Sequence, residues 1–335
     1  MDNLESYIED FLTHIRIEKN YSEATTDTYR FSLTIFSRFL LEANSSITDK
    51  KCILGFINHL KEKGNGDVTI AHRLAALKSF FSYLGKKKGI GKKRLPSIDK
   101  YKTTKKIISI PTDQEVNLFI DAIEKEYRRL KETVDIRTQS NERVKAKFFS
   151  LIRDLTFFTL LTATGLRISE ALNISTEGIN WNECTIKILG KGSKQRLIFF
   201  GIDRLTNLFA ELFRIREQLG IDSPHLFVSY QHRDVLTPRY IQQVMKDFLD
   251  RTSSSSFTPH TLRHYYATSS IEKGANVKAI AILLGHADPS TTIKMYYHIS
   301  KKILKEVFET MNPFSNIVLP VKEMMKKRYE LLANL

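Results

Sequence analysis

Three short segments near the C-terminal end of the chain carry side chains that could bind and attack a phosphodiester. His260 and Arg263 are three residues apart, so they share one face of a helix that Pro259 can begin. Gly285 is typical of a helix C-terminus, and a helix ending there would bring His286 back towards that face. The three segments are Thr258-Pro-His-Thr-Leu-Arg-His264, Leu283-Leu-Gly-His-Ala-Asp-Pro-Ser-Thr-Thr292 and Met295-Tyr-Tyr-His298. An arginine, imidazoles and a phenol at one point are the groups that an oxygen attack on a phosphodiester needs.

The overall charge favours a polyanionic partner. The 335 residues are enough for two domains, each with its own core, and 52 Lys and Arg outnumber 37 Asp and Glu to give a net charge of +15. Nucleic acid is the commonest partner of a soluble protein with such a surplus. The alternative is a generically basic protein of the cytosol.

Other composition signals exclude several classes of protein. The two cysteines, Cys52 and Cys184, lie far apart, so neither a disulfide framework nor a thiolate metal site is expected, and we predict no metal or other cofactor. The N-terminal residues are acidic and helical, unlike a signal peptide. Because no apolar run approaches the roughly 18 residues of a membrane span, we expect no membrane partner and a cytoplasmic location.

Residues 1–88 are predicted to form a small helical domain. Apolar residues recur at helical spacing in four successive stretches, separated by polar or glycine-containing turns. The polar faces carry cations, actual or potential, that could rest on phosphates: Arg30, His72, Arg73 and Lys78. A solvated surface explains these side chains nearly as well.

A basic linker at 89–110 is predicted to separate this domain from a second one. Positions 86–106 hold ten Lys or Arg and a single acid, Asp99. Such a segment suits a protein that closes around a duplex, because each neutralised phosphate releases counterions. A solubilising spacer is the alternative interpretation.

The second domain is predicted at 111–312, after a capping-box pattern at Thr112-Asp-Gln-Glu115. The highly charged residues 124–148 are interpreted as an exposed helical excursion, and the apolar run 149–161 as the central core helix. That helix should end at Gly165. Arg167 would then begin the next helix, with Glu170 one turn further on, where a helix N-terminus and a guanidinium both favour an anion.

The β-structure is predicted to be one antiparallel hairpin. Strands at 185–189 and 196–200 flank a basic, glycine-containing tip that carries Lys191 and Lys194. The tip could reach into a groove, although hairpin lysines are often merely solvated. After the second domain, residues 313–335 are predicted to contain a C-terminal helix that serves either local packing or a contact with another protomer.

Taken in order, five motifs resemble the signature of the tyrosine recombinases, most closely the Xer and phage-integrase branch. The motifs are Gly165-Leu-Arg-Ile-Ser-Glu170, Gly190-Lys-Gly-Ser-Lys-Gln-Arg196, His260-Thr-Leu-Arg-His264, Leu283-Leu-Gly-His286 and Tyr296-Tyr-His-Ile299. The resemblance covers the chain apart from residues 124–148 and the last fifteen or so. It implies a mainly α fold with a small antiparallel sheet in the second domain, in which a helical core-binding domain and a catalytic domain form a two-domain DNA clamp.

The resemblance also implies roles for individual residues. Arg167 and Arg263 would bind the scissile phosphate and stabilise the charge that grows on it. Lys191 would be the general acid that protonates the leaving 5′-oxygen. His260 would assist proton movement at the nucleophile, and His286 would donate a hydrogen bond to a nonbridging oxygen.

Two further roles follow from the same motifs. Glu170 matches the acidic position that orients these side chains. The nucleophile is predicted to be Tyr296, which implies a one-residue insertion after His286 because Met295 stands at the usual interval. Tyr297 is the alternative nucleophile.

The implied activity is site-specific recombination through a 3′-phosphotyrosyl intermediate and a Holliday junction, without metal or ATP. Its biological setting would be chromosome-dimer resolution or the integration and excision of a mobile element. The implied partners are a double-stranded DNA recombination site, three further copies of the chain in a homotetramer on two duplexes, and an accessory protein. Two alternatives are a DNA strand transferase of the type IB topoisomerase or telomere-resolvase kind, and a non-catalytic DNA-binding protein.

Overall fold

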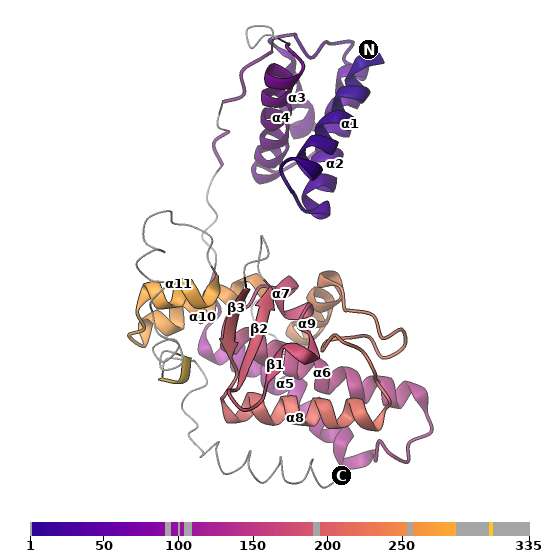
Figure 1. Ribbon diagram of the computed structural model, residues 1–335, viewed down its shortest axis with the longest axis vertical. Coiled ribbons are helices and arrows are strands. Elements are labelled where there is room, and N and C mark those ends of the chain that lie inside the picture. The colour runs from indigo at the N-terminus through magenta and orange to yellow at the C-terminus, as the bar shows by residue number, and fades with distance from the viewer. Residues whose placement is uncertain are drawn as a thin grey trace. The chain divides into compact units, whose positions relative to one another are not determined.

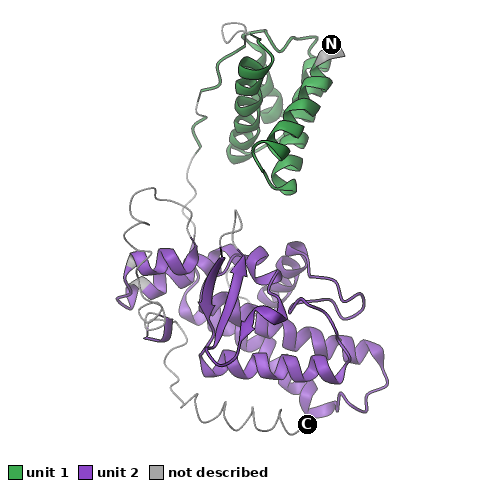
Figure 2. Cartoon of the chain, in the orientation of Figure 1, with its two compact units in different colours: residues 1–107 green, residues 108–335 purple. Residues whose placement is uncertain are grey.

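The computed structural model describes residues 2–90, 95–99, 101–103, 109–189, 195–252, 257–285 and 308–310 (Figure 1). The chain divides into two compact units, Met1–Ile107 and Ile108–Leu335, coloured separately in Figure 2. We refer to them as unit 1 and unit 2. The finer predicted division, with a linker at 89–110 and a terminal helix at 313–335, stays a prediction.

The described part of unit 1 contains four helices around a core rich in phenylalanine. They are α1 (Asp2–Ile17), α2 (Glu23–Glu42), α3 (Cys52–Glu62) and α4 (Asp67–Lys87). The side chain of Ser22 caps α2 by accepting a hydrogen bond from the Thr25 backbone N–H at 3.3 Å. The rings of Phe36 and Phe56 meet edge to face with their centroids 5.1 Å apart, and both are fully buried. The four predicted apolar stripes therefore form the core of this unit.

Unit 2 is built around one long buried helix. Its helices are α5 (Asp113–Thr133), α6 (Glu142–Thr164), α7 (Ile168–Leu172), η1 (Thr176–Gly178), α8 (Asp203–Gln218), α9 (Pro238–Thr252), α10 (Pro259–Glu272) and α11 (Val277–Leu284). Every residue of α6 from Leu151 to Thr164 is buried, because α5, α7, α8 and α10 all contact it (Figure 1). The predicted capping box at Thr112 and Glu115 begins α5.

Two buried charges on α6 are paired rather than solvated. The guanidinium of Arg153 bonds to the carboxylate of Asp154 at 2.8 Å and donates to the hydroxyl of Tyr240 on α9 at 2.6 Å. It also donates to the backbone carbonyl of Val228 at 3.0 Å. This network joins α6, α9 and the intervening loop, and it satisfies charges that would otherwise be costly inside a core.

One three-stranded antiparallel sheet completes unit 2, in the order β1 (Ile179–Asn180), β2 (Thr185–Leu189) and β3 (Gln195–Phe199). The predicted hairpin is β2 paired with β3, in a register that places Ile186 opposite Ile198. The short strand β1 was not expected from the sequence. The prediction of a mainly α fold with a small antiparallel sheet in the second domain is confirmed.

The interpretation of residues 124–148 as an exposed helical excursion is confirmed in part: most of them are helical and exposed or half-buried, but they belong to two packed helices. They form the second half of α5, a short connection and the first turns of α6, and the buried rings of Tyr127 and Phe148 pack 5.3 Å apart. Their charges are high because α5 and α6 pair with each other and with their neighbours, as in the 2.8 Å bond between Lys147 and Glu126. Charge alone does not distinguish this arrangement from a solvated helix.

Candidate active site

Arg167 is positioned by the sharp end of α6. Gly165 ends that helix with a left-handed φ of 62°. A Cβ there would lie 2.6 Å from side-chain atoms of both Leu284 and Tyr266, so only glycine lets α6, α10 and α11 approach so closely. Two residues later Arg167 occupies the N-cap of α7, as the sequence predicted, and its backbone N–H donates to Glu170 at 2.9 Å.

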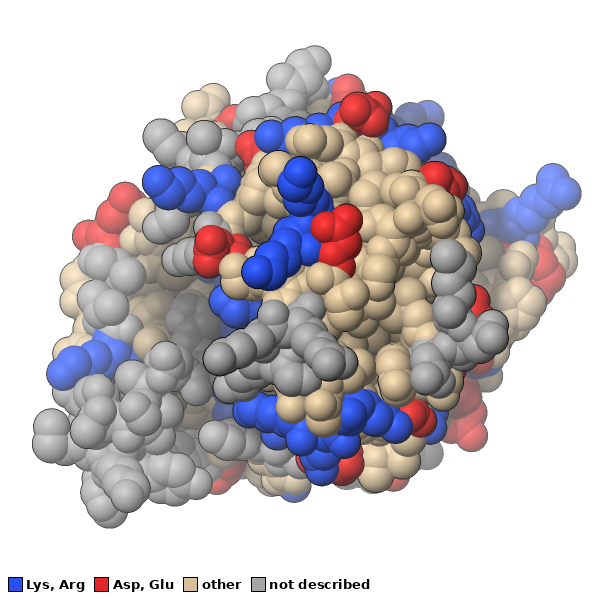
Figure 3. All heavy atoms as spheres, turned by 90° about the horizontal axis from the view of Figure 1, so that it is seen from above, with Lys and Arg blue, Asp and Glu red and all other residues tan. Residues whose placement is uncertain are grey.

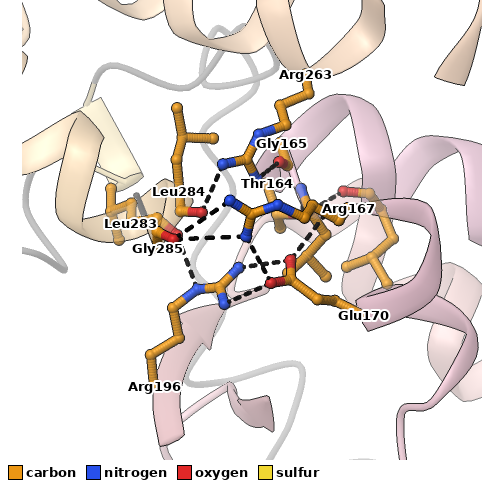
Figure 4. Close-up of polar contacts among 11 residues, drawn as sticks. Thr164, Gly165, Arg167, Glu170, Arg196, Arg263, Leu283, Leu284 and Gly285 are labelled. Carbon is orange, nitrogen blue, oxygen red and sulfur yellow. Dashed lines mark hydrogen bonds and ion pairs between the residues drawn. The ribbon is translucent and has the colours of Figure 1, made fainter. Parts of the chain in front are cut away.

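Glu170 holds two guanidinium groups at once (Figure 4). Its Oε1 accepts from Nη1 of Arg167 at 2.9 Å and from Nη1 of Arg196 at 3.0 Å. Its Oε2 accepts from Nη2 of Arg196 at 2.8 Å. Burial raises the pKa of this carboxyl, but the hydrogen bonds from Arg196 and Arg167 outweigh burial and leave the pKa below its ordinary value. Glu170 is therefore an anion that orients Arg167.

Arg263 lies on α10 with only 5% of its surface exposed. Thr258 accepts from the Thr261 N–H at 3.3 Å, so it begins the helix as the sequence indicated. The Arg263 guanidinium donates to the carbonyl of Gly165 at 2.9 Å and to that of Leu284 at 2.7 Å. Burial, and then the nearby charge of Arg167, lower its pKa to about 10, which still leaves it a cation at neutral pH.

The last carbonyls of α11 are the meeting point of these arginines. Figure 4 shows three successive carbonyl oxygens facing three guanidinium groups from different elements. Leu283 accepts from Arg196 at 3.1 Å, Leu284 accepts from Arg263 at 2.7 Å, and Gly285 accepts from Arg167 at 3.4 Å. These carbonyls lack partners within the helix and carry the negative end of its dipole, so cations stabilise them. The next residue in the chain is the predicted site residue His286.

His260 lies one turn before Arg263 on α10 and is exposed. Its ring meets that of His264 edge to face at 4.8 Å. Partial burial lowers the pKa of His260 below its ordinary value, and the charges of His264, Arg263 and Arg167 lower it further. A neutral imidazole beside two cations can accept a proton. The Nε2 atom of His264 is buried and bonds to none of the described residues.

The structure thus brings together Arg167, Arg263, His260 and Glu170 of the predicted site. The other predicted site residues lie outside the described residues: Lys191, Lys194, His286, Tyr296 and Tyr297. The sequence analysis did not predict a role for Arg196, although this residue ends the second of the five motifs. Within the ranges described, no group of His, Cys, Asp or Glu could hold a metal ion, and no helix has the length and hydropathy to cross a membrane.

The predicted DNA-binding cations of unit 1 differ in their surroundings. Arg30 already pairs with Glu9, and the guanidinium of Arg73 lies over the ring of Phe31 at 5.6 Å. His72 and Lys78 are exposed. On the face that Figure 3 presents, Lys and Arg side chains stand in small groups with Asp and Glu beside them. Contact of these residues with DNA stays a prediction.

Comparison with known proteins identifies the class. The model of the phage integrase family matches residues 124–302, and the N-terminal SAM-like domain of phage integrases matches residues 8–88. The chain belongs to the phage integrase family, whose members are DNA strand-transferring tyrosine recombinases. Because the match begins at residue 124, it includes the charged segment that was expected to lie outside the resemblance.

Among individual proteins the chain is similar to the Xer recombinases. It is 29% identical over 318 residues to tyrosine recombinase XerD of Oceanobacillus iheyensis, covering 92% of this chain and 99% of that protein. It is 30% identical over 316 residues to XerD of Staphylococcus haemolyticus, with coverages of 92% and 99%.

Solved structures share the fold at lower identity. XerH recombinase bound to its difH substrate matches with a TM-score of 0.60 and 21% identity, over 89% of this chain and 83% of that one. A lambda integrase tetramer bound to a Holliday junction matches with a TM-score of 0.61 and 16% identity, over 87% and 76% of the two chains.

Proposed function

We propose that this protein is a site-specific recombinase that cuts and rejoins duplex DNA through a 3′-phosphotyrosyl intermediate. The observation that carries the proposal is the pair of guanidinium groups of Arg167 and Arg263, which we call the phosphate clamp. Both are fixed by acceptors on three different elements before any substrate arrives. Preorganised donors of this kind stabilise charge as it develops, without reorganising during the reaction.

In the proposed reaction a predicted residue accounts for each bond change and each proton transfer. The phenolic oxygen of Tyr296 attacks phosphorus and its proton passes to His260, whose imidazole is neutral. As the new P–O bond forms, the bond from phosphorus to the 5′-oxygen breaks, and Lys191 supplies the proton that the leaving oxygen needs. The clamp, together with His286, stabilises the negative charge on the nonbridging oxygens. The phosphotyrosyl bond keeps the energy of the phosphodiester, so rejoining needs neither ATP nor a metal.

The proposed assembly is a homotetramer on two duplexes, carried over from lambda integrase, whose tetramer is solved on a Holliday junction. One pair of strands is exchanged through the junction and the second pair resolves it. The predicted C-terminal helix at 313–335 would join neighbouring protomers, and an accessory protein would direct the reaction. Similarity to XerD and XerC proteins favours recombination between sites over single-strand relaxation of the type IB topoisomerase kind.

A covalent-trapping experiment tests the proposal. Duplexes carrying Xer recombination sites, nicked just beyond the scissile phosphate, are incubated with the wild type, Tyr296→Phe and Tyr297→Phe, without metal or ATP. We expect the wild type and Tyr297→Phe to give a protein–DNA adduct on a denaturing gel, and Tyr296→Phe to give none.

Other results of the trapping experiment would favour a different nucleophile or a different function. Loss of the adduct only in Tyr297→Phe keeps the chemistry and moves the nucleophile by one residue. A wild-type protein that binds the duplex but never forms an adduct is a non-catalytic DNA-binding protein. An adduct from a protein that relaxes supercoiled DNA but never recombines two sites indicates the topoisomerase-like alternative.

A further inference from the structure

We propose that Arg196 is a positioning residue of the phosphate clamp, holding Glu170 and the end of α11 in place so that Arg167 faces the phosphate. This inference rests on the proposed function. It gives a role to a side chain on β3 that does not itself meet the substrate.

Arg196 donates to one backbone carbonyl and to both oxygens of one carboxylate. Its Nε donates to the carbonyl of Leu283 at 3.1 Å, and its two Nη atoms donate to the two carboxylate oxygens of Glu170 at 3.0 and 2.8 Å. Its side chain is 15% exposed, whereas that of Arg167 is 40% exposed. Arg167 is therefore the accessible partner of Glu170, and Arg196 is the support behind it.

The backbone at the end of α11 is shaped around this guanidinium. Gly285 ends the helix with a φ of 63°. A Cβ at Gly285 would lie 2.8 Å from Nη1 of Arg196 and 2.9 Å from its Cζ. The helix end can therefore approach Arg196 so closely only without a side chain at this position. The same carbonyl of Gly285 accepts from Arg167, so the position of the helix end affects both arginines.

Removal of Arg196 should disturb the clamp in two ways. Glu170 would lose its bidentate partner and keep only Arg167, so the carboxylate and Arg167 could move together. The Leu283 carbonyl would lose its donor, and the end of α11, directly before His286, would be less well fixed. Lysine cannot replace these contacts, because an ammonium group is a point charge without the planar fork that bonds two carboxylate oxygens and a carbonyl together.

The test measures single-turnover cleavage of the nicked duplex at saturating protein, together with the dissociation constant for the uncut duplex. For Arg196→Gln and Arg196→Lys we expect cleavage to slow on the order of 100-fold, the cost of a misplacement of about 1 Å, with duplex binding unchanged. The matched control is Arg204→Gln, which breaks a 2.6 Å pair with Glu124 elsewhere in unit 2 and should cleave like the wild type. If Arg196→Gln does not fold, Arg196→Lys carries the test.

A modified substrate separates the clamp from the hairpin lysine. Arg196 stands five positions after Lys191, so it could instead act by holding the general acid. A duplex with sulfur at the 5′-bridging position needs no proton on its leaving group and therefore bypasses Lys191. We expect the Arg196 variants to stay slow on this substrate. Restoration of the wild-type rate would overturn the proposal.

Hydrogen exchange tests the positioning role of Arg196 without requiring that the protein cleave DNA. In hydrogen exchange, the amides at the end of α11 should exchange faster in Arg196→Gln than in the wild type or Arg204→Gln. If the wild type forms no adduct but α11 loosens, the proposed function fails and the positioning role stands. If exchange at α11 is unchanged, or if Arg196→Gln cleaves at the wild-type rate, the positioning role is wrong.

Discussion

At the scale of single residues, if His260 accepts the proton of the nucleophile as proposed, its protonation would set an acid limit on cleavage. Its pKa lies below 6.5 because of partial burial and the charges of His264, Arg263 and Arg167. The neutral imidazole accepts a proton, so it is the active form above that pKa. Folding stability changes with pH in the same direction. The pKa of His260 is higher in the unfolded chain than in the folded protein, so protonation at falling pH favours the unfolded chain and lowers the free energy of unfolding.

We therefore expect single-turnover cleavage to fall at acid pH, with a midpoint below about 6.5, the ordinary pKa of histidine. The measurement is a pH–rate profile of the wild type beside His260→Gln, which should be slower and should lack this acid limb. An identical limb in both proteins would assign the titration to another group.

At the scale of secondary structure elements, the ends of α6 and α11 meet the middle of α10 at Gly165. Gly165→Ala combines two costs, a left-handed φ for alanine and a Cβ placed 2.6 Å from buried side chains of Leu284 and Tyr266. We expect a loss of about 2–4 kcal/mol in the free energy of unfolding, from overpacking and strain together. Thermal or urea denaturation measures this loss.

Gly220→Ala is the matched control for this prediction. Gly220 has a φ of 59°, and a Cβ added there would meet no heavy atom within 4 Å, so alanine adds backbone strain alone, about 1–2 kcal/mol. Equal losses in the two variants would show that close packing at Gly165 contributes nothing.

The same junction shows what sequence patterns can and cannot predict. The ends of α6 and α11 were predicted because glycine at a helix C-terminus has a local cause, the left-handed backbone at Gly165 and Gly285. Arg196 was missed because its partners are Glu170, 26 positions away, and the carbonyl of Leu283, 87 positions away. A backbone carbonyl leaves no mark in residue type, so such a partner is visible only in three dimensions.

At the scale of the whole molecule, the net charge of +15 predicts steep salt dependence of DNA binding. Each phosphate contact contributes a slope of about −0.9 to log K against log salt. Lys78 on α4 is exposed and forms no ion pair within the described part of the chain, whereas Arg30 already pairs with Glu9. We expect Lys78→Gln to make the slope shallower by about 1 and Arg30→Gln to change it less.

Binding isotherms at several salt concentrations measure these slopes. If Lys78→Gln leaves the slope unchanged, Lys78 does not contact a phosphate, and the solvated-surface interpretation of that face is correct for this residue. A larger change in Arg30→Gln would show that the pair with Glu9 opens when DNA binds.

The mainly helical class and the division into two units could be predicted from apolar periodicity and chain length. Residues 124–148 are largely exposed, as their charge indicated, and the error was to place an exposed segment outside the packed fold. Glu126, Lys131 and Lys147 are charged because they pair across packed helices, and the apolar positions beneath them, Tyr127 and Phe148, are too sparse to give a clear period.

The three carbonyls at the end of α11 also determine when the arginine cluster can become ordered during synthesis of the chain. Arg167, Arg196 and Arg263 are all synthesised before Leu283, so during translation their guanidinium groups exist without the acceptors that residues 283–285 supply. A nascent or truncated chain that stops short of Leu283 would still attract DNA through its charge, but it would hold no ordered clamp. Under the proposed function, such a chain would also lack the predicted nucleophile Tyr296, which follows Leu283 in the sequence.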